Sequence, residues 1–163
     1  MTDDEIRRDL LIAFEYCYLH DDWVNPLHEA LNGLSAQDAL RNCGPATKGI
    51  WDIVLHLAVW NENIVERILS GEKSHPIEGP WPGLPEDLSE ATWEKSKGRL
   101  WDSINSIRST IETAPFEKLN GPPWGIPDLL CRFTHMGYHL GQITKLRECR
   151  VTVEGYKLPS HEC

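Results

Sequence analysis

Two of the seven histidines, His135 and His139, have a spacing suited to metal binding. They lie four positions apart in the string THMGYHLGQ, which has a helical pattern, so both side chains share one helix face about 6 Å apart at Cβ. That separation allows two imidazoles to reach one divalent ion with bonds of about 2.0–2.1 Å. Two semi-buried histidines that hydrogen-bond to neighbours have the same spacing, so the pair alone leaves both readings open.

His56 is the third candidate ligand. It lies in the string WDIVLHLAVWN between apolar residues and is therefore expected to face the protein interior. A buried imidazole without a partner costs about 1–3 kcal/mol, and a metal shared with His135 and His139 would supply that partner. Three neutral histidines leave at least one coordination position open, which is typical of catalytic metal sites. Because the ligands must be neutral, affinity is expected to fall below about pH 6.

Three further residues could act beside the histidines. Gln142 shares the face of His135 and His139, where it could orient a ligand ring or remain a half-exposed polar residue. Cys131 lies one turn before His135 and could add a thiolate. Asp52 lies one turn before His56 and could accept its ring N–H, although a solvated carboxylate is the simpler interpretation.

Helical periodicity runs along most of the chain, and strand patterns are nearly absent. The apolar positions predict helices near 3–33, 47–69, 89–113 and 127–149, followed by an irregular tail from about residue 151. Four helices with polar outer faces predict an all-α fold, a four-helix bundle in which residues 1–163 form a single domain.

Local signals refine these helices. Pro26 predicts a kink in the first helix, or a fresh start near Asp22. Thr47 and Ser89 are candidate N-caps, and Gly141 is expected to allow a neighbouring helix to approach closely.

Two segments rich in proline and glycine, residues 75–88 and 121–127, are expected to be ordered loops. Each contains a tryptophan, Trp81 and Trp124, that could either close one end of the bundle or line a ligand pocket. Trp60 and Trp101 fit the helix stripes and are expected in the core.

Composition excludes several classes of function. Acidic residues outnumber basic ones by 25 to 16, and a net charge of −9 disfavours nucleic acid and anionic lipid as partners. No apolar run reaches the roughly 18–20 residues of a membrane span, and the N-terminus lacks a signal-peptide pattern, so a cytoplasmic protein is expected. Five cysteines without a CxxC pair indicate free thiols.

The strings WDIVLHL and HMGYHLGQI together resemble the DinB/YfiT-like family over most of the chain, with His135 placed 79 residues after His56. That family consists of four-helix bundles in which one histidine of the second helix and two of the fourth bind a divalent metal. The resemblance implies that His56, His135 and His139 are the ligands of one divalent metal ion. Zinc and nickel are the first candidates, with iron and manganese as alternatives, because imidazole accepts all four.

The resemblance also implies a range of functions. Similar proteins include S-transferases and isomerases that use low-molecular-weight thiols, and an open metal site could also serve hydrolysis. The expected partner is therefore a small-molecule substrate, with a thiol as one option, and the expected assembly is a homodimer. The alternatives are a non-catalytic metal-binding protein of a stress response, and a helical oligomer with a vestigial site.

Overall fold

The computed structural model describes residues 2–20, 25–42, 47–122 and 125–155, with only the backbone described for 149–155. All regular secondary structure in these ranges is helical, which confirms the all-α prediction. The helices are α1 (Asp3–Tyr18), α2 (Leu27–Leu31), α3 (Ala36–Leu40), α4 (Ile50–Ser70), α5 (Glu90–Thr113), α6 (Phe116–Leu119) and α7 (Gly125–Gly155).

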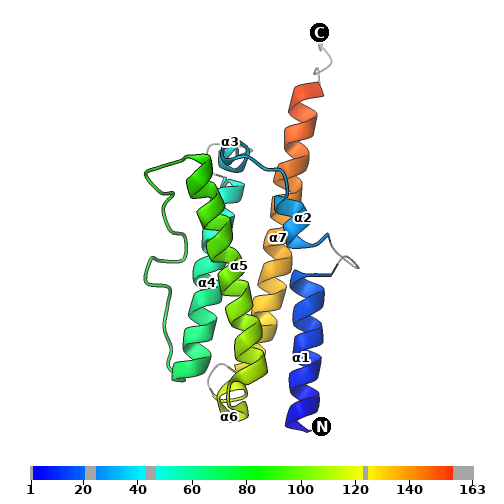
Figure 1. Cartoon of the computed structure of the whole chain (residues 1–163), viewed down its shortest axis with the longest axis vertical. Helices are drawn as coiled ribbons and strands as arrows, with labels where there is room; N and C mark the ends of the chain where they lie inside the picture. Colours follow the sequence, from blue (N-terminus) through cyan, green and yellow to red (C-terminus); the bar gives the residue numbers. More distant parts are fainter. Residues whose placement is uncertain (1, 21–24, 43–46, 123–124, 156–163) are drawn as a thin grey trace, which may run out of the picture.

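The four long helices α1, α4, α5 and α7 lie side by side (Figure 1). α4 packs against α5 and α7, and α1 packs against the same two helices. α1 and α7 run in one direction along the molecule, whereas α4 and α5 run in the other. Of the short helices, α2 lies beyond the end of α1 and packs against α7, whereas α3 and α6 lie at opposite ends of the helix array (Figure 1).

The connection between α4 and α5 is long because these two helices are parallel. The chain leaves α4 at Gly71, whose φ of 77° is the left-handed conformation that commonly ends a helix. It then returns along the length of α4 to Ser89, where α5 begins (Figure 1). We call residues 71–89 the return loop. Its prolines prevent helix formation, as expected from the sequence.

The core is built on large aromatic side chains from different helices. Trp51 of α4 and Trp93 of α5 are fully buried with their ring centroids 5.3 Å apart. The indole N–H of Trp51 donates to Ser96 Oγ at 2.9 Å, and that of Trp93 donates to the Leu34 carbonyl at 2.8 Å. Both buried donors are therefore satisfied.

Trp60 and Trp101 are only half-buried, so their predicted place in the core is wrong in part. Trp101 packs against the core from its margin, and the Trp60 ring lies beside the guanidinium groups of Arg67 and Arg132. Gly141 is also placed differently from the prediction, because a Cβ atom there would meet nothing within 4 Å. The close approach is at Gly49 instead, where a Cβ would lie 2.9 Å from the Ala39 carbonyl oxygen.

The helix predicted at 3–33 is two helices. α1 ends at Tyr18, and α2 starts after Pro26, which has the extended backbone of an N-cap. Proline has no N–H to continue a helical ladder, which explains the separation. Asp22, the alternative start, lies outside the described residues.

The starts of α4 and α5 lie within a few residues of the predicted positions. α4 starts at Ile50 with Gly49 as N-cap rather than Thr47, because the Asp52 carboxylate accepts the Gly49 N–H at 3.0 Å. α5 begins after Ser89, whose Oγ accepts the Thr92 N–H as an N-cap should.

α7 is longer than the predicted 127–149 at both ends. The irregular tail expected from residue 151 is therefore wrong as far as Gly155, since no proline or glycine interrupts residues 142–154. The short helices α3 and α6 were not predicted.

Candidate metal centre

His56, His135 and His139 converge at one point between α4 and α7. The Nε2 atom of His135 lies 3.0 Å from the Nε2 atoms of both His56 and His139. One ligand nitrogen from each ring falls within 4.8 Å of the others, so the three residues could hold a metal ion. They form the only such group of His, Cys, Asp or Glu side chains in the described part of the chain. The structure thus brings together the three residues selected from the sequence.

The antiparallel packing of α4 and α7 produces this convergence. His135 and His139 lie one turn apart on α7, so both can face the single histidine of α4. His56 and His139 are 5% and 3% exposed, respectively, whereas His135 is half-buried. The rings are therefore largely shielded by protein but still approached by solvent beside His135.

The outer nitrogens of two rings are held by acceptors. His56 Nδ1–H donates to the Pro80 carbonyl of the return loop. His139 Nδ1–H donates to Gln142 Oε1 at 2.7 Å, and Gln142 Nε2 donates to the Tyr138 hydroxyl at 2.9 Å. A proton on Nδ1 leaves the Nε2 lone pair free, and an acceptor behind the ring fixes its orientation, as is common for metal-binding histidines. Gln142 thus has the contact expected of a residue that orients a ligand.

His135 has a different neighbour. Its Nδ1 atom lies 3.0 Å from Arg132 Nη1. A guanidinium has donors only, so this nitrogen of His135 accepts the hydrogen bond. No sequence pattern singled out Arg132, although its position three residues before His135 places it on the same helix face.

The pKa values of all three imidazoles are lowered. Burial is the main cause, and it brings the pKa of His56 to about 4 and that of His135 to about 3. The positive charge of Arg132 lowers the pKa of His135 further. Burial lowers the pKa of His139 as well, although its hydrogen bond to Gln142 opposes that effect. The rings are therefore neutral at pH 7, the form that binds metal.

Aromatic side chains surround the cluster. Trp81 of the return loop stacks on His56, with centroids 3.8 Å apart and planes inclined by 19°. Tyr138 meets His139 edge to face at 5.0 Å. Of the two roles considered for Trp81, the structure places it against the histidines rather than at an end of the helix array. Trp124 lies outside the described residues.

Cys131 and Asp52 do not join the centre. The Cys131 side chain is exposed and free. Asp52 caps α4 and forms an ion pair with Lys48 at 3.4 Å; its side chain is 18% exposed, so it is neither a partner of His56 nor the solvated carboxylate that was expected.

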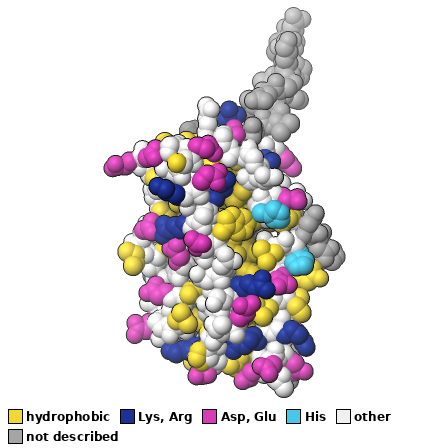
Figure 2. Space-filling model, in the orientation of Figure 1, with side chains coloured by type: hydrophobic (Ala, Val, Ile, Leu, Met, Phe, Trp, Pro, Cys, Tyr) yellow, Lys and Arg dark blue, Asp and Glu magenta, His cyan; other side chains and the backbone are white. Residues whose placement is uncertain are grey.

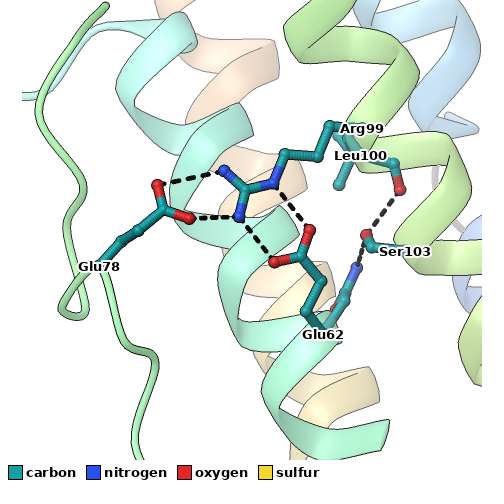
Figure 3. A network of polar contacts seen from close by, with 6 residues as sticks. Glu62, Glu78, Arg99, Leu100 and Ser103 are labelled. Atoms are coloured by element: carbon teal, nitrogen blue, oxygen red, sulfur yellow. Dashed lines mark hydrogen bonds and ion pairs between the residues drawn. The ribbon is translucent and has the colours of Figure 1, made fainter.

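Arg99 of α5 fastens the return loop that covers His56 (Figure 3). Its Nε and Nη2 atoms each donate at 2.7 Å to the two oxygens of Glu62 on α4. The guanidinium also donates to both oxygens of Glu78 on the return loop, at 2.5 and 3.2 Å. These hydrogen bonds lower the pKa of Glu78, so the ion pair persists at neutral pH. The loop carrying Pro80 and Trp81 is thereby tied to both α4 and α5.

The surface agrees with the composition. Acidic and basic side chains are interspersed on the face shown in Figure 2, and the chain carries a net charge of −9. No described helix has the length and apolar character needed to cross a membrane. Searches of protein-family models, curated proteins and solved structures found no match to this chain.

Proposed function

We propose that this protein is a divalent-metal-dependent enzyme of the DinB/YfiT-like type, with α1, α4, α5 and α7 as its four-helix bundle and His56, His135 and His139 as the metal ligands. The observation that carries the proposal is the convergence of one ring nitrogen from each of the three imidazoles within 4.8 Å. The outer hydrogen bonds of His56 and His139, which leave their Nε2 lone pairs facing inward, support it.

The proposed chemistry follows from the ligand set. Three neutral imidazoles hold a divalent ion and leave coordination open, and the bound ion supplies a Lewis acid for thiol transfer, isomerisation or hydrolysis. Trp81 and the other aromatic neighbours shield the rings from water, and Gln142 holds His139 in one orientation. A small molecule, with a low-molecular-weight thiol as one candidate, is the proposed substrate.

Zinc and nickel are the proposed metals, with iron and manganese as alternatives. Imidazole nitrogen binds all four, and none of the described neighbours of the rings adds a thiolate or carboxylate that would select among them.

Metal content tests the first step of the proposal. The protein should be purified without a histidine tag and analysed for metals, and the affinity for Zn²⁺ and Ni²⁺ should be measured by calorimetry. His56→Ala, His135→Ala and His139→Ala should each weaken binding at least a hundredfold, because two imidazoles bind far less tightly than three. His75→Ala is the matched control, since His75 is exposed and outside the cluster. Equal affinities in all four variants would contradict the proposed site.

A non-catalytic metal-binding role in a stress response is the second candidate. It is favoured by the composition of the cluster, in which the described residues include no carboxylate to serve as a general base. Turnover of a panel of thiol-conjugation and hydrolysis substrates by metal-loaded protein separates the two. Metal-dependent turnover supports the enzyme, whereas tight binding without turnover supports the alternative.

We also propose a cytoplasmic homodimer. Free thiols at Cys17 and Cys131 suit a reducing compartment. α7 exposes Leu130 and Tyr138, which lie on one side of the helix and could bury apolar area against a second copy. Light scattering at tens of micromolar protein checks the assembly.

A further inference from the structure

Arg132 is a cation beside the histidine cluster, and no carboxylate among the described residues forms an ion pair with it. Its Nη1 atom contacts His135, and its guanidinium carbon lies 5.1 Å from the centre of the Trp60 ring. Its Nε–H is buried and has no hydrogen-bond partner among the described residues. The acidic neighbour that acts on it, Asp128, instead forms an ion pair with Arg67 at 3.3 Å.

The contact with Arg132 determines which nitrogen of His135 carries the proton. Because the guanidinium only donates, His135 Nδ1 is an acceptor, and the neutral ring must carry its hydrogen on Nε2. That hydrogen points toward the Nε2 lone pairs of His56 and His139, each 3.0 Å away. Those two rings carry their hydrogens on Nδ1, where Pro80 and Gln142 accept them. Every ring hydrogen of the cluster therefore has an acceptor.

The same arrangement opposes metal binding at His135. A metal bound to Nε2 requires the ring hydrogen on Nδ1, where it would face the N–H of Arg132, and two donors cannot share one hydrogen bond. If Nε2 of His135 held a metal, its proton would have to move to Nδ1, with no net release, and Arg132 would have to turn away from the ring. A guanidinium that leaves this contact would take another acceptor, and a carboxylate is the acceptor that matches its charge and its two parallel N–H groups.

We propose that Arg132 binds the carboxylate group of a small-molecule ligand, and that carboxylate binding and metal binding favour each other. The inference rests on the proposed metal site. The Nε–Nη2 edge of a guanidinium matches a carboxylate with two parallel hydrogen bonds, as the Arg99–Glu62 pair shows in this protein. The Nε–H of Arg132, which lacks a partner, belongs to that edge. Such coupling must be reciprocal, so each ligand raises the affinity for the other by the same factor.

The first experiment uses the metal-free protein and is independent of metal binding. Nitrogen chemical shifts of the imidazoles should place the hydrogen of His135 on Nε2 and those of His56 and His139 on Nδ1. Propionate, added at constant ionic strength, should shift the Arg132 Nε resonance in a saturable way, whereas sulfate tests a tetrahedral oxyanion in place of a carboxylate. A hydrogen on Nδ1 of His135, the absence of a propionate effect, or an equal response to sulfate would overturn the proposal.

The second experiment measures Zn²⁺ affinity by competition with a chelating dye. Propionate should raise the affinity of the wild-type protein at least threefold. Arg132→Gln should bind Zn²⁺ more tightly than wild type without propionate, because its amide oxygen can accept the Nδ1–H of His135, and should lose the propionate effect. Arg132→Lys, which keeps the charge but not the two-pronged edge, should show a reduced propionate effect. Arg8→Gln, a change on an exposed side chain, is the matched control and should behave as wild type.

The outcomes separate the two proposals. Retention of the propionate effect in Arg132→Gln would show that the anion acts on the metal itself and would overturn the inference, as would weaker Zn²⁺ binding by this variant. Failure of Zn²⁺ to bind either protein would refute the metal site and with it the coupling. Circular dichroism of each variant verifies that it is folded.

Discussion

At the scale of single residues, the three imidazoles differ in what holds their outer nitrogen. A backbone carbonyl holds His56, a side-chain amide holds His139 and a guanidinium meets His135. The first two are acceptors that favour a metal-binding ring, and the third is a donor that does not. The cluster is therefore asymmetric, although its ligands are chemically identical.

Gln142 should contribute to affinity through His139. Gln142→Leu removes the acceptor behind the ring, and losses of an outer hydrogen bond of this kind typically reduce metal affinity about 10- to 100-fold. Gln142→Glu retains an acceptor and should bind within a few fold of wild type. Calorimetric titration with Zn²⁺ measures both. Gln37→Leu, at an exposed position on α3, is the control, and an equal effect there would dismiss the role of Gln142.

The metal-free protein should lose stability as pH falls from about 6.5 toward 4. In this window the imidazoles of the unfolded chain bind protons, whereas those of His56 and His135 stay neutral because burial lowers their pKa to about 4 and about 3. The unfolded state then binds more protons than the folded state, so the free energy of unfolding decreases as pH falls. Above pH 6.5 the free energy of unfolding keeps its full value. Thermal unfolding between pH 7.5 and 4.5 measures this slope, which should be shallower in His56→Leu.

Metal binding should persist to a lower pH than the value of about 6 expected from ordinary histidines. Protons compete with the metal only as pH approaches the lowered pKa values of the folded rings. Zn²⁺ affinity measured at pH 7, 6 and 5 should change little between the first two values. A tenfold loss of Zn²⁺ affinity per pH unit, beginning at pH 6.5, would contradict this prediction.

At the scale of secondary-structure elements, the parallel course of α4 and α5 has the largest consequence. It requires the return loop to run back along α4, and this brings Pro80 and Trp81 onto His56. Arg99 then joins the loop to α4 and α5 through Glu78 and Glu62. The loop thus acts as an ordered part of the candidate site.

Arg99→Met should loosen the return loop without unfolding the protein. Half-exposed ion pairs of this kind contribute about 0.2–1 kcal/mol each, so the free energy of unfolding should fall by about 1 kcal/mol. Hydrogen exchange at the Gly79 amide, which donates to the Pro76 carbonyl, should accelerate about fivefold.

Arg108→Met is the control for that change, because Arg108 also lies on α5 and pairs with two carboxylates, Glu15 and Glu112, away from the loop. In the Arg108→Met variant, the Gly79 amide should exchange at the wild-type rate. Equal acceleration in both variants would mean that Arg99 has no specific hold on the loop.

At the scale of the whole molecule, the helices share an apolar core that does not depend on the histidines. Trp51, Trp93, Phe14 and Ile104 are at most 1% exposed and come from three different helices. Burial of this kind is the dominant favourable contribution to folding. The candidate metal is therefore expected to serve chemistry more than structure.

Removal of metal should leave the protein folded. The helical circular dichroism should be unchanged after chelation, unlike that of a zinc finger. Metal at one hundred times its dissociation constant should add about 2.7 kcal/mol to the free energy of unfolding, equivalent to roughly 5–10 °C in melting temperature. Loss of the helical signal on chelation would show that the core cannot hold the helices alone.

The sequence by itself determined the features that depend on neighbouring residues. Apolar periodicity located α4, α5 and most of α7, since a helix stripe repeats within a few residues whatever its partner. The i, i+4 spacing of His135 and His139 and the apolar setting of His56 selected the cluster for the same reason. Gln142, three positions after His139, followed from the same helix geometry.

Only the tertiary structure decided the features that depend on contacts between distant segments. The parallel course of α4 and α5, the carbonyl of Pro80 behind His56 and the stacking of Trp81 have no local sequence pattern, because they depend on the path of the chain between elements. The contact of Arg132 with His135 is local, but its importance appears only once the other two rings and their acceptors are in place. The spacing of side chains along one helix depends on a few neighbouring residues. Which ring nitrogens of the cluster face a donor and which face an acceptor depends on how several elements meet.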